Sequence, residues 1–261
     1  MIHIYMENDT AKTEEELVIM SKGCSLLAGV MRALEEKIAI GVTGLEIDAL
    51  AEKMIRDAGC EPAFKGYGGE DGEIPFPATI CFSLNEGIVH GIPSERVICD
   101  GDVVKIDIGL RYKGYYADMA RTFLVGNVSQ QAQKLADVTQ KAFFKGIATI
   151  RHGSTLMDYA QAVQKHVERN GFSVVKNLVG HGIGKQLHEA PQIPNYVSKK
   201  IPNFVFEKGM TVAIEPMVNV GGEETQIASD GWAFETADGS LSAHYENTLL
   251  VTAHGVNILT Q

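Results

Sequence analysis

Apolar residues recur every three to four positions in the first part of the chain and predict two amphipathic helices. Each begins at a capping box, at 13–16 and 43–46, where a threonine hydroxyl and a glutamate carboxylate bond the exposed helix-start amides. The first apolar series extends over 17–34, and the second helix is expected to end at Gly59. The N-terminal segment is therefore predicted to be helical.

The pattern then changes to short apolar runs bounded by turn residues, which is typical of strands. A strand at 103–108 and a partner at 116–125 are predicted to form a hairpin, with Lys113 and Gly114 at the turn. After that the helical spacing returns and is again followed by apolar runs. We expect helices over 129–150 and 155–170, and strands over 172–179, 210–218 and 245–252.

This order, two helices and then antiparallel strands, occurs twice and indicates an internal duplication. Gly41 and Gly153, which precede corresponding helices, are 112 positions apart (153 − 41). The alternative is chance, because glycine is common near helix ends. We favour one α+β domain, 1–261, with pseudo-repeat halves at about 13–125 and 129–254 and a shared cleft where they meet.

Composition places the chain among folded proteins with an acidic surface. Of its 261 residues, 45% are hydrophobic and 21% charged, and 33 acidic against 23 basic residues give a net charge of −10. This balance argues against a direct nucleic-acid partner. The four cysteines are widely separated and form no C-x-x-C pair, so we expect reduced thiols. The sequence shows no signal-peptide pattern and no uninterrupted apolar run of ~18 residues. We therefore expect a cytoplasmic protein with no membrane partner.

The predicted hairpin contains acidic residues in apolar surroundings. With a two-residue turn, Asp107 lies opposite Ala120, and Asp118 points to the same sheet face because side chains alternate with period two. Burying adjacent carboxylates is costly unless a positive charge compensates them. A bound metal ion would do so. Alternatively, Asp107 pairs with Arg111 or Arg121 in an exposed hairpin.

Two further strands repeat this feature, because Glu215 ends one apolar run and Glu246 begins another. His181, within a glycine-rich segment, would add a nitrogen donor, and such a donor set suits Mn, Fe, Co or Zn. His90 and His188 are further candidates.

The remaining histidines, His244 among them, are interpreted as packing residues. No nucleophile elbow, phosphate-binding loop or dinucleotide-binding motif is present, so serine-hydrolase and nucleotide-binding functions are disfavoured.

The five residues Asp107, Asp118, His181, Glu215 and Glu246, in this order and spacing, resemble the ligand set of the M24 metallopeptidases. Segments 85–93 and 240–246 resemble the methionine aminopeptidases within that family. Glu215 and Glu246 are only 31 positions apart (246 − 215), which leaves no room for the insert of the type 2 enzymes. The resemblance is thus to the bacterial-style type 1 enzymes and implies their α+β pita-bread fold.

The resemblance also implies an activity. Such enzymes remove the N-terminal methionine from nascent proteins, preferring a small second residue, by attack of a hydroxide held between two divalent ions (Co, Mn, Fe or Zn). Glu215 would also shuttle protons, while His90 and His188 would contact the substrate. The implied methionine pocket consists of Tyr67, Cys81, Leu187 and Trp232, and a monovalent cation is implied near Asn85, Gly87 and Ser242.

The segment 70–77 departs from the family, because it is longer and more acidic than the usual link. We expect it to shape the pocket rim and the second-residue preference.

The expected partners are nascent polypeptide N-termini, with transient ribosome contact, and the chain is expected to be a monomer.

Three alternatives stay open from the sequence. They are a proline-specific peptidase of the same fold, a non-catalytic pita-bread binding protein, and an unrelated dinuclear phosphoesterase.

Overall fold

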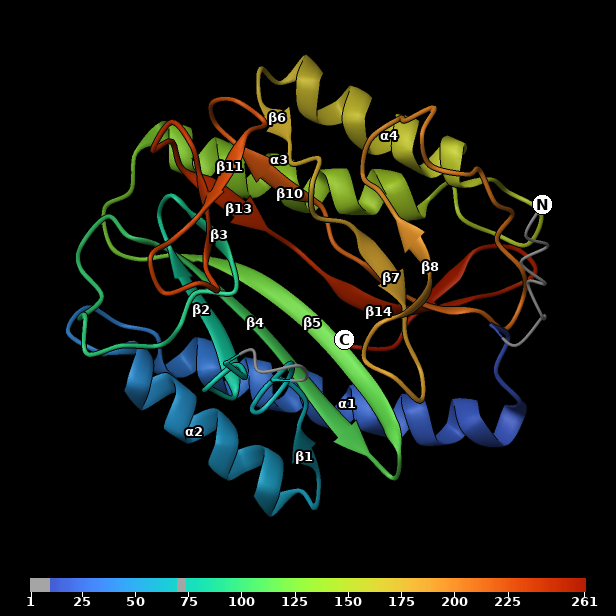
Figure 1. Ribbon diagram of the computed structural model, residues 1–261, viewed down its shortest axis with the longest axis horizontal. Coiled ribbons are helices and arrows are strands. Elements are labelled where there is room, and N and C mark those ends of the chain that lie inside the picture. The colour runs from blue at the N-terminus through green and yellow to red at the C-terminus, as the bar shows by residue number, and fades with distance from the viewer. Residues whose placement is uncertain (1–9, 70–73) are drawn as a thin grey trace.

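The computed structural model describes residues 10–69 and 74–261. Two successive groups of elements make up this part of the chain, and each begins with a pair of helices (Figure 1). The first group consists of α1 (Glu14–Lys37), α2 (Gly44–Asp57), β1 (Glu61–Pro62), β2 (Ile80–Leu84), β3 (Gly87–Val89), β4 (Val103–Tyr112) and β5 (Tyr115–Leu124). The second consists of α3 (Gln130–Ile147), α4 (Leu156–Arg169), β6 (Ser173–Val174), β7 (Gly180–Gly182), β8 (Glu189–Ile193), β9 (Thr211–Ile214), β10 (Met217–Asn219), β11 (Thr225–Ile227), β12 (Phe234–Thr236), β13 (Ser242–His244), β14 (Asn247–Val251) and β15 (Val256–Ile258).

The helix starts agree with the prediction. Thr13 accepts a hydrogen bond from the amide of Glu16 and returns one from its own amide to the Glu16 carboxylate. The equivalent reciprocal bonds cap α2 at Thr43 and α4 at Thr155. The predicted helix over 129–150 is shorter than expected and ends at Ile147.

The hairpin also has the predicted register. Lys113 and Gly114 have φ angles of 48° and 87°, the left-handed pair that a tight two-residue hairpin turn requires. Asp107 therefore pairs with Ala120, and Asp118 with Gly109.

The other predicted strands need correction. Of 172–179, only Ser173–Val174 is a strand. The run 210–218 is divided into β9 and β10 around Glu215 and Pro216, where proline lacks the amide that a continuous ladder needs. The run 245–252 begins later, at Asn247, so that Glu215 and Glu246 both lie just outside the strands that carry them.

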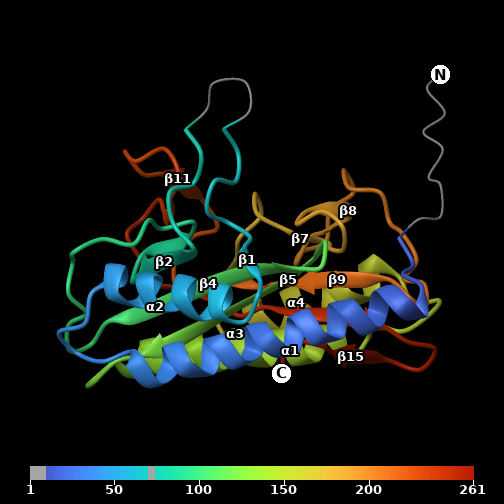
Figure 2. The ribbon, with the colours of Figure 1, turned by 90° about the horizontal axis from the view of Figure 1, so that it is seen from below.

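The two largest apolar clusters of the core lie under the strands. One lies between α1, α2 and the sheet of β2, β4 and β5, and the other lies between α3, α4 and the strands β9, β10 and β14. Helices α1, α2 and α3 lie along one side of β4 and β5, while β8 and β11 lie on the other (Figure 2). This arrangement leaves one face of the strands free to line a site.

The two groups meet along β5. The amides and carbonyls of Ala120 and Glu246 bond to each other, and the Thr248 hydroxyl donates to the carbonyl of Asp118. These bonds place Glu246 beside the acidic hairpin. The division into duplicated halves stays a prediction.

Helix α1 is long and apolar enough, by length and composition, to cross a membrane. It is also a core helix, because it packs against β4 and β5, and residues such as Cys24, Leu27 and Leu34 are fully buried. We interpret its apolar character as the requirement of this packing.

Packing of α3 on α4 gives a first prediction. A Cβ at Gly146 would lie 2.6 Å from ring and methyl carbons of Tyr159 and Val163, so Gly146→Ala should lower the free energy of unfolding by about 1–3 kcal/mol. In α1, a Cβ at Gly29 would have only Arg32 within 4 Å, at 3.9 Å. Gly29→Ala should therefore raise the free energy of unfolding by about 0.5–1 kcal/mol. Urea unfolding followed by circular dichroism measures both. Equal effects would contradict the packing described.

Candidate metal centre

Five metal-binding side chains converge on one cavity, although they come from separate elements. The cavity has a volume of about 570 Å³, and its lining includes the acidic residues and the histidine predicted as ligands. Those residues are Asp107 of β4, Asp118 of β5, His181 of β7, Glu215 after β9 and Glu246 before β14.

The donor atoms are close enough to share an ion. One potential ligand atom from each of Asp118, His181 and Glu246 lies within 4.8 Å of the others. The His181 Nε2 is also 3.6 Å from Oε1 of Glu215 and 4.0 Å from Oδ2 of Asp118. Separations of this size are too long for hydrogen bonds and leave room between the donors.

The electrostatics of these carboxyl groups are unfavourable without a cation. Burial raises the pKa of Asp118, Glu215 and Glu246 well above the usual range, and neighbouring carboxyl groups add to this effect for Asp118 and Glu246. Burial likewise raises the pKa of Asp107 to about 7. One oxygen of Asp107 and one of Asp118 have no hydrogen-bond partner in the described part of the chain.

The arginine alternative does not hold. Arg121 donates to the backbone carbonyls of Ala120 and Glu246 and to the side chain of Asn247, and Arg111 pairs with Glu61. Within residues 10–69 and 74–261, no arginine pairs with Asp107 or Asp118. The orphaned oxygens and the mixed oxygen and nitrogen donors therefore fit a divalent cation.

His181 is oriented for ligation by its backbone. Its Nδ1 lies 2.8 Å from the carbonyl oxygen of Gly182, so we assign the proton to Nδ1, which leaves the Nε2 lone pair facing the carboxylates. Burial lowers its pKa to about 3, which keeps the ring neutral. The flanking glycines are required, because a Cβ at Gly180 or Gly182 would lie within 2.5 Å of a backbone oxygen.

The two other candidate histidines also line the cavity. Nδ1 of His188 lies 2.5 Å from the Tyr67 hydroxyl, and its ring stands 4.5 Å from the ring of His181. His90 lies against Trp232 and Phe234, and burial lowers its pKa to about 4.

The residues suggested for a methionine pocket line the same cavity, beside Phe64 and Phe76. Trp232 packs edge-on against Phe76 and donates its indole N–H to the carbonyl of Ile74. The C-terminal part of the segment 70–77 therefore contacts the cavity wall, whereas residues 70–73 lie outside the described residues.

His244 requires a correction, because the sequence assigned it to packing. It is 1% exposed, and its Nε2 lies 3.6 Å from Oε2 of Glu215. Neither ring nitrogen has a hydrogen-bond partner in the parts of the chain described. Its position between Ala243 and Tyr245 gave no signal in the sequence, since only the return of β13 beside β10 brings it to Glu215.

The residues suggested for a monovalent cation lie outside the cavity lining. The Ser242 amide donates to the Asn85 carbonyl at 3.0 Å, and Gly87 lies in the adjacent β3.

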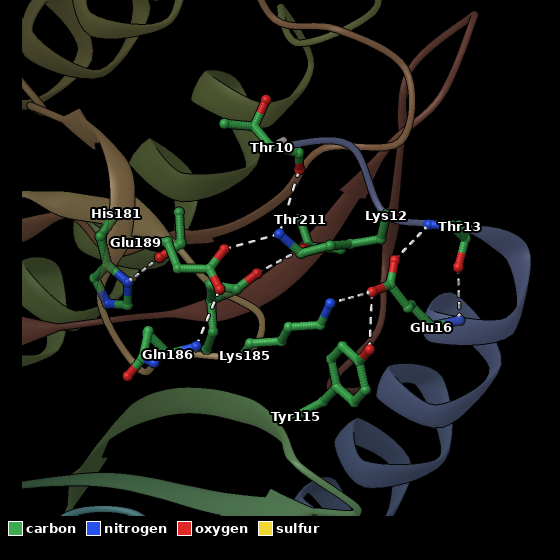
Figure 3. A network of polar contacts seen from close by, with 12 residues as sticks. Thr10, Lys12, Thr13, Glu16, Tyr115, His181, Lys185, Gln186, Glu189 and Thr211 are labelled. Carbon is green, nitrogen blue, oxygen red and sulfur yellow. Dashed lines mark hydrogen bonds and ion pairs between the residues drawn. The ribbon is translucent and has the colours of Figure 1, made fainter. Parts of the chain in front are cut away.

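The loop that carries Leu187 and His188 is fastened to the start of α1 (Figure 3). The ammonium of Lys12 pairs with Glu189 at 2.8 Å, and Glu189 accepts the amide of Gln186. Lys185 pairs with Glu16 at 2.9 Å. These contacts set the position of the segment that carries the cavity-lining His188.

Comparison with known proteins agrees with this geometry. The family model described as "Metallopeptidase family M24" matches residues 18–253. The chain belongs to metallopeptidase family M24. The M24 assignment confirms the resemblance inferred from the ligand spacing and supports divalent metals as the cofactor.

The relatives within M24 are similar over nearly their whole length. The methionine aminopeptidase of Clostridium perfringens is 44% identical over 95% of this chain and 97% of its own. Methionine aminopeptidase 1 of Bacillus subtilis is 42% identical over 96% and 98%. The crystal structure of the Thermotoga maritima methionine aminopeptidase superposes with a TM-score of 0.91 at 39% identity, covering 96% of this chain and 98% of that one.

The proline-specific members of M24 share the fold. The prolidase of Pyrococcus horikoshii gives a TM-score of 0.77 at 24% identity, and the match covers 97% of this chain but 63% of the prolidase. The predicted pita-bread fold is thus confirmed, while the full-length similarity is to the methionine aminopeptidases.

The raised carboxyl pKa values predict that metal binding releases protons. Without metal, the raised pKa values of Asp118, Glu215 and Glu246 favour their protonated forms and the pKa of Asp107 is about 7, so an ion must displace protons. The apparent affinity for Mn²⁺ should therefore rise as the pH rises from about 6 to about 8. Titration calorimetry in two buffers of different ionisation enthalpy measures the proton release. Identical heats in both buffers would show that the carboxyl groups are already ionised.

The contacts of Lys12 yield a separate prediction. Lys12→Met leaves the largely buried Glu189 without its ion-pair partner. Hydrogen exchange over residues 183–189 should therefore accelerate, and the free energy of unfolding should fall by about 1–3 kcal/mol. Mn²⁺ affinity should not change, because all five donors remain. The matched control is Lys53→Met, since the Lys53–Asp57 pair is exposed and should contribute less than about 1 kcal/mol. Unaltered exchange in the loop would exclude the anchoring role.

Proposed function

We propose that this chain removes the N-terminal methionine from nascent proteins and peptides that have a small second residue. The observation that carries this proposal is the position of the acidic donor cluster in a cavity that also has an apolar wall. A cluster of this kind supplies hydrolytic chemistry, and the apolar walls supply a place for an unbranched side chain such as methionine.

Two divalent ions per chain, chosen among Co, Mn, Fe and Zn, would be held by the five clustered side chains. Bound divalent ions acidify water and polarise a carbonyl group, which is the chemistry that peptide hydrolysis needs. The ligands would be Asp107, Asp118, His181, Glu215 and Glu246.

Glu215 is suited to moving protons. Burial raises its pKa well above that of a free glutamic acid, which makes its carboxyl group a better proton carrier than a solvated one. His244 lies 3.6 Å from the second carboxyl oxygen and limits the positions that Glu215 can take.

His188 and His90 would contact the peptide bond. We assign the Tyr67 hydroxyl as the donor to Nδ1 of His188, which leaves Nε2–H of His188 free to donate to the substrate carbonyl oxygen. His90 remains neutral because burial lowers its pKa to about 4, so it can accept or donate a hydrogen bond without adding charge.

The apolar walls would hold the methionine side chain. Cys81 and Leu187 are buried, and the aromatic rings of Trp232 and Phe76, packed edge-on against each other, line the cavity. A thioether makes favourable contacts with aromatic edges, so this wall suits methionine better than a charged side chain.

Charge and composition support the further proposals on cell biology. We propose nascent polypeptide N-termini as partners, with transient ribosome contact, a monomeric chain and a cytoplasmic location. The net charge of −10 supports the absence of a direct nucleic-acid role, and the four free cysteines suit a reducing compartment. No membrane association is proposed.

The test is a peptide-cleavage assay read by mass spectrometry. Metal-stripped protein receives Met-Ala-Ser, Met-Lys-Ser or Ala-Pro-Ser peptides, with and without Mn²⁺, Fe²⁺ or Co²⁺. We expect metal-dependent loss of methionine from Met-Ala-Ser alone. His188→Ala should lower kcat/KM by about 10²–10³-fold, as loss of one oxyanion donor does, whereas the exposed His254→Ala should not alter it.

Cleavage of Ala-Pro-Ser instead would retain the fold and the metal site but replace the substrate. Absence of cleavage with metal bound would favour the non-catalytic alternative.

A further inference from the structure

Lys105 of β4 is enclosed by the protein and is only 1% exposed. Its Nζ donates to the backbone carbonyl of Asn85 at 2.8 Å and to that of Val103 at 3.3 Å. The ion pairs of the described residues do not include it. An interior lysine held by carbonyl oxygens, without a carboxylate partner, needs an explanation beyond packing.

Asn85 is one of the three residues that the family resemblance assigns to a monovalent cation. Its carbonyl oxygen accepts two hydrogen bonds, from the Lys105 ammonium and from the amide of Ser242 at 3.0 Å. A carbonyl oxygen has two lone pairs, and both are engaged here. The residues present therefore do not fit a bound alkali ion.

The ammonium group supplies what such an ion would supply. It carries one positive charge and three N–H donors, and it binds carbonyl oxygens, as a potassium or sodium ion does. A buried charge is costly, and here two carbonyl dipoles and the nearby acidic groups of Glu86 and Asp102 offset that cost.

Lys105 and Ser242 both donate to the carbonyl oxygen of Asn85, so three segments that lead into the metal centre meet there. The Asn85 backbone, with φ of 47°, forms the turn between β2 and β3, and β3 leads directly to His90. Lys105 precedes Asp107 by two positions in β4, so both side chains point to the same face. Ser242 begins β13, which leads to Glu246.

We propose that the Lys105 ammonium replaces a bound monovalent cation, fastening the β2–β3 turn to β4 at the carbonyl that also bonds Ser242 of β13, so that this chain needs neither Na⁺ nor K⁺ to hold its site. This inference goes beyond the proposed function, and its principal test does not depend on activity.

The experiment compares wild type, Lys105→Ala and Lys105→Met in KCl, NaCl and choline chloride at equal ionic strength. Lys105→Ala frees the two carbonyl oxygens and leaves space for an ion, so its Tm should rise by about 5–10 °C in KCl or NaCl at ~100 times the dissociation constant. Lys105→Met fills the same space with an apolar chain and should not respond. The wild-type Tm should be the same in all three salts.

Cleavage of Met-Ala-Ser by the Mn²⁺-loaded proteins provides the second readout. The activity of Lys105→Ala should fall in choline chloride and recover in KCl or NaCl, which a purely structural defect would not do. If no variant cleaves the peptide but the Tm pattern holds, the proposed function fails and this inference stands.

Three results would overturn the inference. They are a wild-type Tm that depends on Na⁺ or K⁺, a soluble Lys105→Ala protein that ignores both ions, and a Lys105→Met protein that responds as strongly as Lys105→Ala. The wild-type measurement alone remains decisive if Lys105→Ala does not fold.

Discussion

The burial of four carboxyl groups in one cavity is the constraint on which the rest of this structure depends. Asp107, Asp118, Glu215 and Glu246 face one cavity, and burial raises the pKa of each carboxyl group. Such a cluster lowers the stability of the metal-free protein, and a cation is its natural partner. The stability lost in this region has to be recovered elsewhere, in the two apolar clusters beneath the strands.

The scaffold places positive side chains near the site but not on its carboxylates. Arg121 turns away to backbone carbonyls, Lys105 is held by the Asn85 and Val103 carbonyls, and Lys12 pairs with Glu189, which is not one of the five predicted ligands. A lysine or arginine among the ligands would neutralise the carboxylates and compete with the metal. The basic residues instead fasten the segments that carry the functional groups, and the acidic donors stay available.

Interactions across the two groups of elements complete the site. The bonds between Ala120 and Glu246 bring β5 to the segment before β14, and a glycine on each side lets His181 approach closely. The pairing of β10 with β13 brings His244 to within 3.6 Å of Glu215. Each of these contacts joins residues far apart in the sequence, so small shifts between strands would separate the donors.

The sequence by itself determined the features that depend on local chemistry. Capping boxes at Thr13, Thr43 and Thr155 marked the helix starts, because their hydrogen bonds join residues three apart. The turn at Lys113–Gly114 determined the hairpin register, and with it the shared face of Asp107 and Asp118. The spacing of the five ligands was specific enough to indicate the family.

Tertiary structure alone decided what depends on pairing between distant strands. The late start of β14 followed from its pairing with β9, which an apolar run does not reveal. His244 resembled any packing histidine, and Lys105 resembled a surface lysine in a strand, until their partners were in place. The physical reason is that burial and charge compensation are properties of the surroundings, which the chain provides only once it has folded.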